Sequence, residues 1–331
     1  MNSVDPPKRG LAAVEEGRER RQRFPKIPGR FWLWVFTILA GWAIVYWKIT
    51  QGQLESWRNR LLSEQRAVAS ELAPRFTPLR DKIEAWTVQA AGSYSGDFIS
   101  PEAIRSDFRS QPGIYLRLVL NDAQTVQGMR SAAEDSLRDG FTSCFTTHKN
   151  PDPFAGTACK SNSECKGGEH CNETNHCTVP AQPYNLRVAY RATRILYDDW
   201  ARAVREASSD MRLRLLDRDL QSAVRDDIPL VIDLMTRAKY FMLVLDEKPP
   251  QDVQVPDAGT FAESLQAVVH AARVFVWRLE DDKLLLRVRT TASADAATVA
   301  KAPAAQLAIR RQSNNCAIAL DVRRRLESTE P

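Results

Sequence analysis

The feature that most constrains this chain is an uninterrupted apolar stretch near its beginning. Residues 31–47 contain no charged side chain, and Arg30 and Lys48 bound the stretch on either side. As a helix, these seventeen residues would be about 25 Å long. That is at the short end of what crosses a hydrocarbon core of about 30 Å. The stretch therefore predicts one transmembrane helix.

Aromatic side chains gather at both ends of this stretch, as is typical of membrane helices. Amphipathic rings favour the headgroup level of a bilayer, and flanking Arg and Lys side chains can extend outward to water. We expect five of these aromatic residues to act as membrane anchors: Trp32, Trp34, Trp42, Tyr46 and Trp47.

Two other interpretations fit the same stretch less well. A cleaved signal peptide would use Gly41-Trp42-Ala43 as a small-x-small cleavage site, but Trp and Tyr run straight through that site. A buried core helix would need a packing partner, and residues 1–30 offer nothing to form the other side of a core.

The residues ahead of the stretch are basic. Residues 1–30 hold 8 of the 46 Lys and Arg residues and 4 of the 41 Asp and Glu residues, so they supply +4 of the net charge of +5. A basic excess beside a membrane helix favours the cytoplasmic side. We therefore expect a disordered cytoplasmic tail over residues 1–30, with the 284 residues after the span outside the cytoplasm.

The charge that remains argues against a nucleic acid partner. Residues 31–331 are left with a net charge of only +1, whereas nucleic-acid binding needs a concentrated basic face. The basic tail itself could bind anionic lipid headgroups, but the orientation of the chain already explains its charge.

An amphipathic segment follows the membrane stretch. Leu54 and Leu61 belong to an apolar stripe at helical spacing, which predicts a juxtamembrane helical stalk over residues 48–90. We expect Pro74 and Pro78 to interrupt this helix. The stripe would either form a homodimer with a second copy of the chain or pack on the chain's own domain.

The rest of the chain mixes helical and strand patterns, which predicts an α+β domain over residues 91–140 and 184–322. The expected strands are residues 114–120 with one buried face, a segment with Leu186, Val188 and Tyr190, the buried run 240–245, and a hairpin of residues 274–279 and 284–288. The expected helices are one from Asn121 to about Asp139, a long one with Trp200, Met211 and Leu215 toward the core, one opened by Pro229, and one capped by Thr260 that ends near Ala272. A last short element over residues 316–322 precedes a frayed tail at 323–331.

Residues 141–183 break this pattern because they are rich in cysteine. They hold five of the six cysteines, and four of these recur with five residues between neighbours: Cys159, Cys165, Cys171 and Cys177. The loop between them is polar, so it would order only when cross-linked or bound to a metal. Zinc sites usually place ligands in pairs two to four residues apart, which favours disulfides, although His170 and His176 could ligate.

This insert resembles a known kind of module. The pattern Cys159-x-Ser161-x-x-Glu164-Cys165-x-x-Gly168-x-x-Cys171, followed by Cys177, is similar to small cysteine-rich modules of secreted proteins, of the Dickkopf N-terminal kind. The resemblance covers nineteen of the 331 residues. Those modules carry more cysteines, and an aspartate more often precedes the second one. The resemblance implies an oxidised, exposed insert and no activity.

The connectivity of the cysteines is open in the sequence, because four cysteines allow three pairings and six allow fifteen. We expect two bridges within residues 159–177, a third between Cys144 and Cys316, and no metal. The third bridge would close a loop of about 170 residues, which by chain entropy stabilises a fold by about 4 to 5 kcal/mol.

The sequence carries no motif that identifies a reaction. It has no phosphate loop, Gly-x-Ser-x-Gly, His-Glu-x-x-His or dinucleotide fingerprint. Of its four histidines, three lie in or beside the insert, and His270 is expected in a helix. Paired acids such as Asp198 and Asp199 are expected at turns or helix starts, where capping explains them. We expect no catalytic, cofactor-binding or metal-binding residues.

Together these features predict a single N-terminal transmembrane helix followed by an extracytoplasmic mixed α/β domain with a disulfide-rich loop insert. We expect a non-enzymatic scaffold or accessory subunit that contacts the lipid bilayer and membrane protein partners. A ligand-binding sensor is the alternative, and it would need a concavity with convergent polar groups. A tethered hydrolase would need a nucleophile and a base within hydrogen-bond reach. The high Arg and Ala content favours a bacterial inner (cytoplasmic) membrane with the domain in the periplasm, over a eukaryotic membrane with an extracellular domain.

Overall fold

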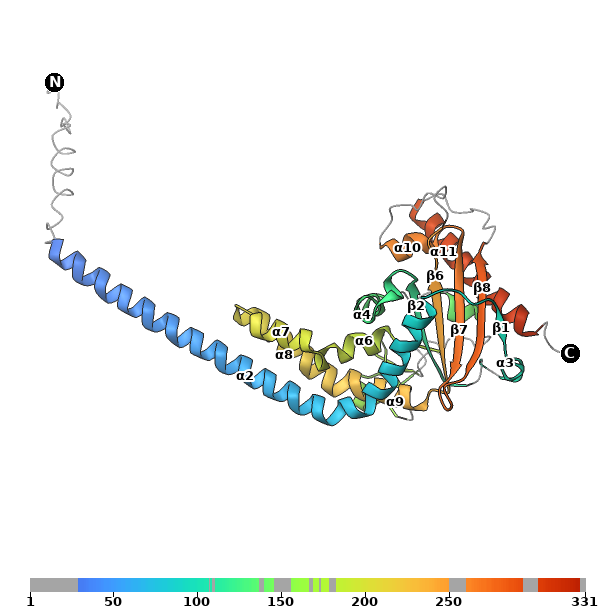
Figure 1. Cartoon of the computed structure of the whole chain (residues 1–331). Helices are drawn as coiled ribbons and strands as arrows, with labels where there is room; N and C mark the ends of the chain where they lie inside the picture. The colour runs from blue at the N-terminus through green and yellow to red at the C-terminus, as the bar shows by residue number, and fades with distance from the viewer. Residues whose placement is uncertain are drawn as a thin grey trace, which may run out of the picture. The chain divides into compact units, whose positions relative to one another are not determined.

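The structure is a computed structural model of the chain, and it describes residues 29–106, 108, 111–136, 140–145, 156–166, 169–172, 174–178, 183–249, 260–293 and 303–327. The chain divides into two compact units, Met1–Trp57 and Arg58–Pro331. The disordered tail predicted for the start of the chain falls on residues 1–28, which lie outside the described residues. Figure 1 shows the elements that follow.

The described part of the first unit is the beginning of helix α2, which runs over Gly29–Ala90. By length and composition this helix could cross a membrane, and its apolar window is not buried. A core helix would be buried, whereas a signal sequence near the N-terminus would meet the same criteria. The five predicted anchor residues all lie on this helix and are exposed: Trp32, Trp34, Trp42, Tyr46 and Trp47.

The second unit is built on one mixed six-stranded sheet with the order β1-β8-β7-β6-β2-β5. Its strands are β1 (Phe98–Ile99), β2 (Gly113–Val119), β5 (Tyr184–Asn185), β6 (Tyr240–Asp246), β7 (His270–Arg278) and β8 (Leu284–Ala292). Strand β2 pairs in parallel with both β5 and β6, while β6, β7, β8 and β1 pair in antiparallel fashion. The predicted mixed α/β class is therefore confirmed.

Helices cover both faces of this sheet. On one face, Tyr240, Met242 and Val244 of β6 share a core with Phe141 of α5 (Phe141–Phe145) and Ile318 of α11 (Pro303–Glu327). On the other face lie the end of α2 and three helices near β2 and β5 (Figure 1): α4 (Val126–Glu134), α6 (Arg187–Thr193) and α9 (Ile228–Arg237). The remaining helical elements are α3 (Pro101–Arg105), η1 (Asp122–Gln124), η2 (Asn162–Glu164), η3 (Arg194–Leu196), α7 (Asp198–Glu206), α8 (Asp210–Ser222), η4 (Ala223–Asp227) and α10 (Phe261–Gln266).

The part of α2 that belongs to the second unit packs on its own domain. Leu61 and Ile83 are buried, and the Trp86 ring stacks on Trp277 of β7 with 5.4 Å between ring centroids. The guanidinium of Arg58 donates to the carbonyl oxygen of Ala207, in the turn between α7 and α8, at 3.1 and 2.6 Å. The apolar stripe was expected either to form a homodimer or to pack on the chain's own domain. Leu61 of this stripe packs on the chain's own domain.

The prolines do not interrupt α2, contrary to the prediction. The helix continues through Pro74 and Pro78 to Ala90, and its second half bends (Figure 1). A proline inside a helix removes one hydrogen bond and crowds the preceding turn, which kinks or breaks the helix; α2 bends and continues. Phe76, between the two prolines, is buried.

Two predictions of element type were wrong: one predicted strand is a helix, and the end of one predicted helix is a strand. The segment with Leu186 and Tyr190 forms α6 rather than a strand, and Ala189 and Thr193 complete its buried helical face. In the opposite direction, His270 is the first residue of β7 rather than part of a helix that ends near Ala272. Helix α10 stops at Gln266, although its predicted capping box at Thr260 is present.

Other boundaries differ as well. Strand β2 is buried on both faces instead of one, and the helix predicted to run to Asp139 is α4, which ends at Glu134. The predicted long helix is α7 and α8, separated by residues 207–209, and Met211 and Leu215 are exposed rather than in the core.

Two predictions at the C-terminal end also differ from the structure. The short element over residues 316–322 is part of the long helix α11. This helix extends through residues 323–327, which were predicted to fray. The hairpin predicted around Asp281 is confirmed as β7 and β8.

Candidate functional site

The parallel pair β2 and β6 defines the most distinctive site in the described part of the domain. Their register pairs Gly113 with Tyr240 and Val119 with Asp246, so the carboxyl ends of both strands reach the same edge of the sheet. In sheets with parallel strands, ligands commonly bind outside this edge, between the loops that follow the strands.

A cleft of about 390 Å³ lies at this edge. Helix α4 and the two residues after it form one wall, the start of α10 and Gln266 form another, and the ends of β2 and β6 form the floor. The described lining residues are Arg117, Leu118, Val119, Asp122, Gly128, Ser131, Ala132, Asp135, Ser136, Asp246, Thr260, Phe261, Ala262 and Gln266. Exposed carboxylates and hydroxyl groups, those of Asp122, Asp135, Ser131 and Thr260, therefore surround a concavity whose floor holds the buried side chains of Arg117 and Asp246.

The local sequence explains the shape of the α4 wall. Thr125 caps the helix, its side chain accepting from the backbone N–H of Gly128 at 3.1 Å. A Cβ on Gly128 would lie 2.7 Å from the backbone oxygen of Asp122, so a larger residue would push the helix away from η1. The small residues that follow, Ser131 and Ala132, leave room between α4 and α10.

An ion pair between Arg117 and Asp246 lies in the floor of the cleft. The guanidinium donates through Nε and Nη2 to the two carboxylate oxygens at 2.8 and 2.9 Å. The two side chains are 1% and 2% exposed. Such a bidentate arrangement fixes both groups in one geometry, which lets a buried pair offset much of its desolvation cost.

His270 joins the same carboxylate from β7. Its Nε2 lies 3.1 Å from Oδ1 of Asp246, and its Nδ1 lies 2.8 Å from the carbonyl oxygen of Val268. Both partners are hydrogen-bond acceptors, so each ring nitrogen of His270 faces an acceptor.

The charge of Asp246 is set by these neighbours. Burial by itself raises the pKa of this carboxyl group, but the charges of Arg117 and His270, with their hydrogen bonds, hold the pKa well below its ordinary value. Asp246 is therefore a fixed carboxylate at neutral pH. Such a carboxylate holds the side chains of Arg117 and His270 in place, and it is not suited to take up and release a proton in a reaction.

Helix α11 completes the network from the far side. Asn315 accepts from Nη1 of Arg117 at 2.7 Å, and its amide nitrogen lies 3.4 Å from the side-chain oxygen of Gln266. The neighbouring Asn314 donates to the backbone carbonyls of Gln266 and Val268 at 3.0 and 3.1 Å. The floor of the cleft is thus connected to α10, β7 and α11 by hydrogen bonds.

The cysteines singled out in the sequence lie away from this cleft's lining. They form three pairs at disulfide distance: Cys144 with Cys316, Cys159 with Cys171 and Cys165 with Cys177. Their Cα atoms are 5.2, 5.9 and 5.5 Å apart, within the range that a disulfide spans. This connectivity agrees with the expected bridge from 144 to 316 and with two bridges inside 159–177.

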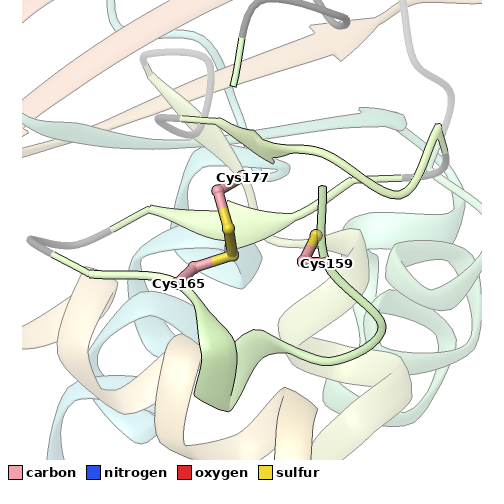
Figure 2. A group of neighbouring side chains, drawn as sticks. All are labelled: Cys159, Cys165 and Cys177. Atoms are coloured by element: carbon pink, nitrogen blue, oxygen red, sulfur yellow. A yellow bond between two sulfur atoms is a disulfide. The ribbon is translucent and has the colours of Figure 1, made fainter. Parts of the chain in front are cut away.

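Three of these sulfur atoms are close enough together to be considered as metal ligands. Those of Cys159, Cys165 and Cys177 all lie within 4.8 Å of one another. Figure 2 shows Cys165 bonded to Cys177, with Cys159 beside them. The two bridges end on paired residues of a small sheet, Cys171 of β3 (His170–Cys171) and Cys177 of β4 (Cys177–Thr178), and this pairing accounts for the closeness of the sulfur atoms.

Sequence reasoning missed Arg117, Asp246 and His270 as a group. One signal was available: Arg117 interrupts the apolar run of residues 114–120, and Asp246 ends the apolar run of residues 240–245. A charged residue in a buried strand needs a partner of opposite charge. The identity of that partner depends on which strands pair, and this was not readable from the sequence.

Comparison with known proteins found no relative of this chain. No family model, no curated protein and no solved structure matches the chain. The resemblance of residues 159–177 to cysteine-rich secreted modules therefore stays a local prediction.

Proposed function

We propose that the domain of residues 58–327 binds a small polar ligand in the cleft beyond β2 and β6, as the sensor part of a membrane-anchored protein. In this proposal residues 31–47 span the cytoplasmic membrane and residues 1–30 lie in the cytoplasm. The domain then faces the periplasm or the cell exterior and signals inward through a partner protein.

The observation that carries this proposal is the cleft with its rigid polar floor. Its volume of about 390 Å³ lies in the range of small-molecule sites, which combine apolar lining with a few well-placed polar groups. The Arg117–Asp246 pair is already satisfied within the protein. Binding would therefore use a preformed surface and need little reorganisation of charge.

The charges of the lining indicate the kind of ligand. Asp122 and Asp135 add exposed carboxylates, whereas Arg117 is the one cation among the described lining residues and is engaged by Asp246. Ser131 and Thr260 supply hydroxyl groups. We therefore expect an amine or an uncharged polyhydroxy compound rather than an anion.

A thermal-shift screen of the full-length chain in detergent tests the proposal. Small amines and sugars form one panel, and dicarboxylic acids form the contrasting panel. A ligand at 100 times its Kd stabilises a fold by about 2.7 kcal/mol, so a true ligand should raise Tm by several degrees. Ser131→Trp, which fills the cleft, should abolish the shift, and Ser208→Trp, at an exposed turn position, should leave it unchanged.

Two results would contradict a ligand site in the cleft. One is a screen in which neither panel stabilises the protein. The other is a stabilising compound whose effect persists in Ser131→Trp, because it would then bind elsewhere. A shift with dicarboxylic acids alone would keep the site but overturn the expected ligand charge.

A scaffold function is the second candidate, and a different observation favours it. Met211 and Leu215 lie one turn apart on α8 and are 68% and 46% exposed. An exposed apolar pair on one helix face is suited to contact with another protein. Cross-linking in native membranes should capture a partner with the wild type and not with a Met211→Arg, Leu215→Arg double variant. Equal capture by both would count against this surface.

A further inference from the structure

Helix α4 contacts two different parts of the domain through two faces. One face, with Gly128, Ser131 and Ala132, lines the cleft. The other face is packed into the domain, with Met129 buried, and it carries Arg130. Helix α4 therefore lies between the cleft and the residues that Arg130 contacts.

Arg130 contacts the end of α2. Its guanidinium donates through Nε and Nη2 to the two carboxylate oxygens of Glu84, both at 2.8 Å. The Glu84 side chain is 4% exposed and that of Arg130 is 34% exposed. A bidentate pair of this kind is sensitive to small displacements, because both hydrogen bonds require the two planar groups to stay aligned.

Two further side chains extend this contact. Nε of Arg80, one turn before Glu84, lies 3.7 Å from a Glu84 carboxylate oxygen. The Tyr197 ring, just before α7, contacts both guanidiniums, with the central carbons of Arg80 and Arg130 at 5.1 and 5.0 Å from the ring centroid. Cations placed against an aromatic face in this way are attracted to it. The cluster joins α2, α4 and the start of α7.

Elsewhere α2 is held by other parts of the domain. Arg60 pairs with Asp217 of α8 at 2.8 Å, and Gln221 of α8 donates to Glu64 at 2.6 Å. Trp86 stacks on the sheet. In the described part of the chain, the Glu84–Arg130 pair is the ion pair that joins α2 to the α4 wall of the cleft. The contacts of α2 with α8 and with the sheet do not involve α4.

We propose that the Glu84–Arg130 pair couples the cleft to α2, so that occupancy of the cleft changes the packing of the helix that leads toward the apolar segment. This inference rests on the proposed ligand site and adds its route of regulation. A ligand wedged between α4 and α10 shifts α4 and changes the alignment of Arg130 with Glu84. The end of α2 then repacks against α7. Such coupling requires that the two states of the cleft differ in their contacts with α2, which this pair supplies.

Hydrogen exchange measured by mass spectrometry on the full-length chain in detergent tests this coupling without knowledge of the ligand. Ser131→Trp serves as the occupied state because it fills the cleft. Its exchange should differ from the wild type in peptides from α4 and also in peptides from residues 76–90 of α2. In an Arg130→Lys background, which keeps the charge but not the two-pronged contact, the difference should remain in α4 and fall at least severalfold in α2.

The matched control is Arg214→Lys, because Arg214 forms an exposed pair with Asp210 on α8 at 2.6 Å. In that background the α2 response to Ser131→Trp should keep its full size. Arg130→Met is a harsher variant, and circular dichroism would report whether it still folds; the conclusion depends on the lysine variant alone.

The outcomes separate the two proposals. If Ser131→Trp leaves the α2 peptides unchanged, or if the α2 response is equally large in the Arg130→Lys background, the coupling is wrong. If a compound from the thermal-shift screen stabilises the wild type and the Arg130→Lys variant alike and alters exchange only in α4, the ligand site stands and the coupling fails. Loss of all stabilising compounds would instead remove the ligand site.

Discussion

Helix α2 differs along its length in which side chains are buried. In residues 31–47 large apolar side chains are exposed, and Trp34 is 71% exposed. In residues 58–90 polar side chains are buried, and Glu84 and Thr87 are 3% and 0% exposed. One helix geometry therefore serves two environments.

The surroundings of each side chain, rather than the helix that carries it, decide which residue types a position tolerates. Two of the buried polar groups in the second half have a partner outside the helix: Gln65 donates to the carbonyl oxygen of Ile195 at 3.1 Å, and Glu84 accepts from the Arg130 guanidinium at 2.8 Å. Thr87 instead donates to the carbonyl oxygen of Ile83 in its own helix at 2.8 Å. An exposed apolar surface likewise needs a complementary environment. For residues 31–47 we propose that this environment is the bilayer.

Charging the apolar half should have the largest effect. On insertion scales an arginine at the centre of a membrane helix costs about 2.5 to 3.5 kcal/mol, so Ile38→Arg combined with Leu39→Arg should remove the chain from the membrane. The measurement is the fraction of protein that stays with membranes after carbonate extraction. Met211→Arg with Leu215→Arg is the matched control, since it places two arginines at exposed positions outside the apolar stretch and should leave extraction unchanged. A double variant in residues 38 and 39 that remains fully membrane-bound would contradict the span.

Removing the charged partner of a buried side chain should have the second largest effect. Asp246→Asn preserves shape but leaves the Arg117 guanidinium buried without its carboxylate, which typically destabilises a fold by about 3 to 5 kcal/mol. Urea unfolding of the full-length chain in detergent at pH 7 would measure the free energy of unfolding. A loss below about 1 kcal/mol, the ordinary value for an exposed pair, would show that Arg117 is hydrated rather than buried.

Acid should weaken the same network with a defined direction. The pKa of Asp246 is lower in the folded chain than in the unfolded chain, where it is about 3.9. The unfolded chain therefore binds more protons as the pH falls through this window, so the stabilisation is fully present above about pH 5 and is lost progressively below about pH 4. Urea midpoints measured from pH 7 to pH 3 should fall less steeply in Asp246→Asn than in the wild type. Parallel curves would assign the acid sensitivity to other groups.

The exposed counterpart of this substitution should have the smallest effect. Asp217 pairs with Arg60 of α2 at 2.8 Å, and the Arg60 side chain is 62% exposed. Asp217→Asn is the same chemical change as Asp246→Asn, yet it should cost only about 0 to 1 kcal/mol, because exposed pairs are screened by water and salt. A loss comparable to that of Asp246→Asn in the same urea assay would erase the contrast between the two ion pairs.

Sequence reasoning predicted the elements whose signals are local. The hairpin around Asp281 and the capping box at Thr260 depend on residues within a few positions of one another, and both are present. The segment with Leu186 and Tyr190 failed because its apolar residues fit alternation as well as a helical face. Short apolar segments are ambiguous in this way, and only their tertiary packing decides between strand and helix.

The candidate site was much harder to predict. Arg117 and Asp246 are 129 positions apart, and they meet because β2 and β6 are parallel neighbours in register. Nothing in either strand specifies that pairing. His270 was placed in a helix, so its contribution to the same carboxylate could not be seen. The cysteine pairs were easier, since covalent chemistry and even spacing narrow the choices.

The pairing of Cys144 with Cys316, whose positions are 172 apart, also determines how the domain responds to a protease. Everything from α6 through β8 lies in the ring that this pair closes, so one cut anywhere in the ring opens it without releasing a fragment. The nicked chain would migrate at full mass on a gel without reductant and split in two when reductant is added. If the domain lies outside the cell, as we propose, a cut in this ring by an external protease would leave both halves of the chain joined.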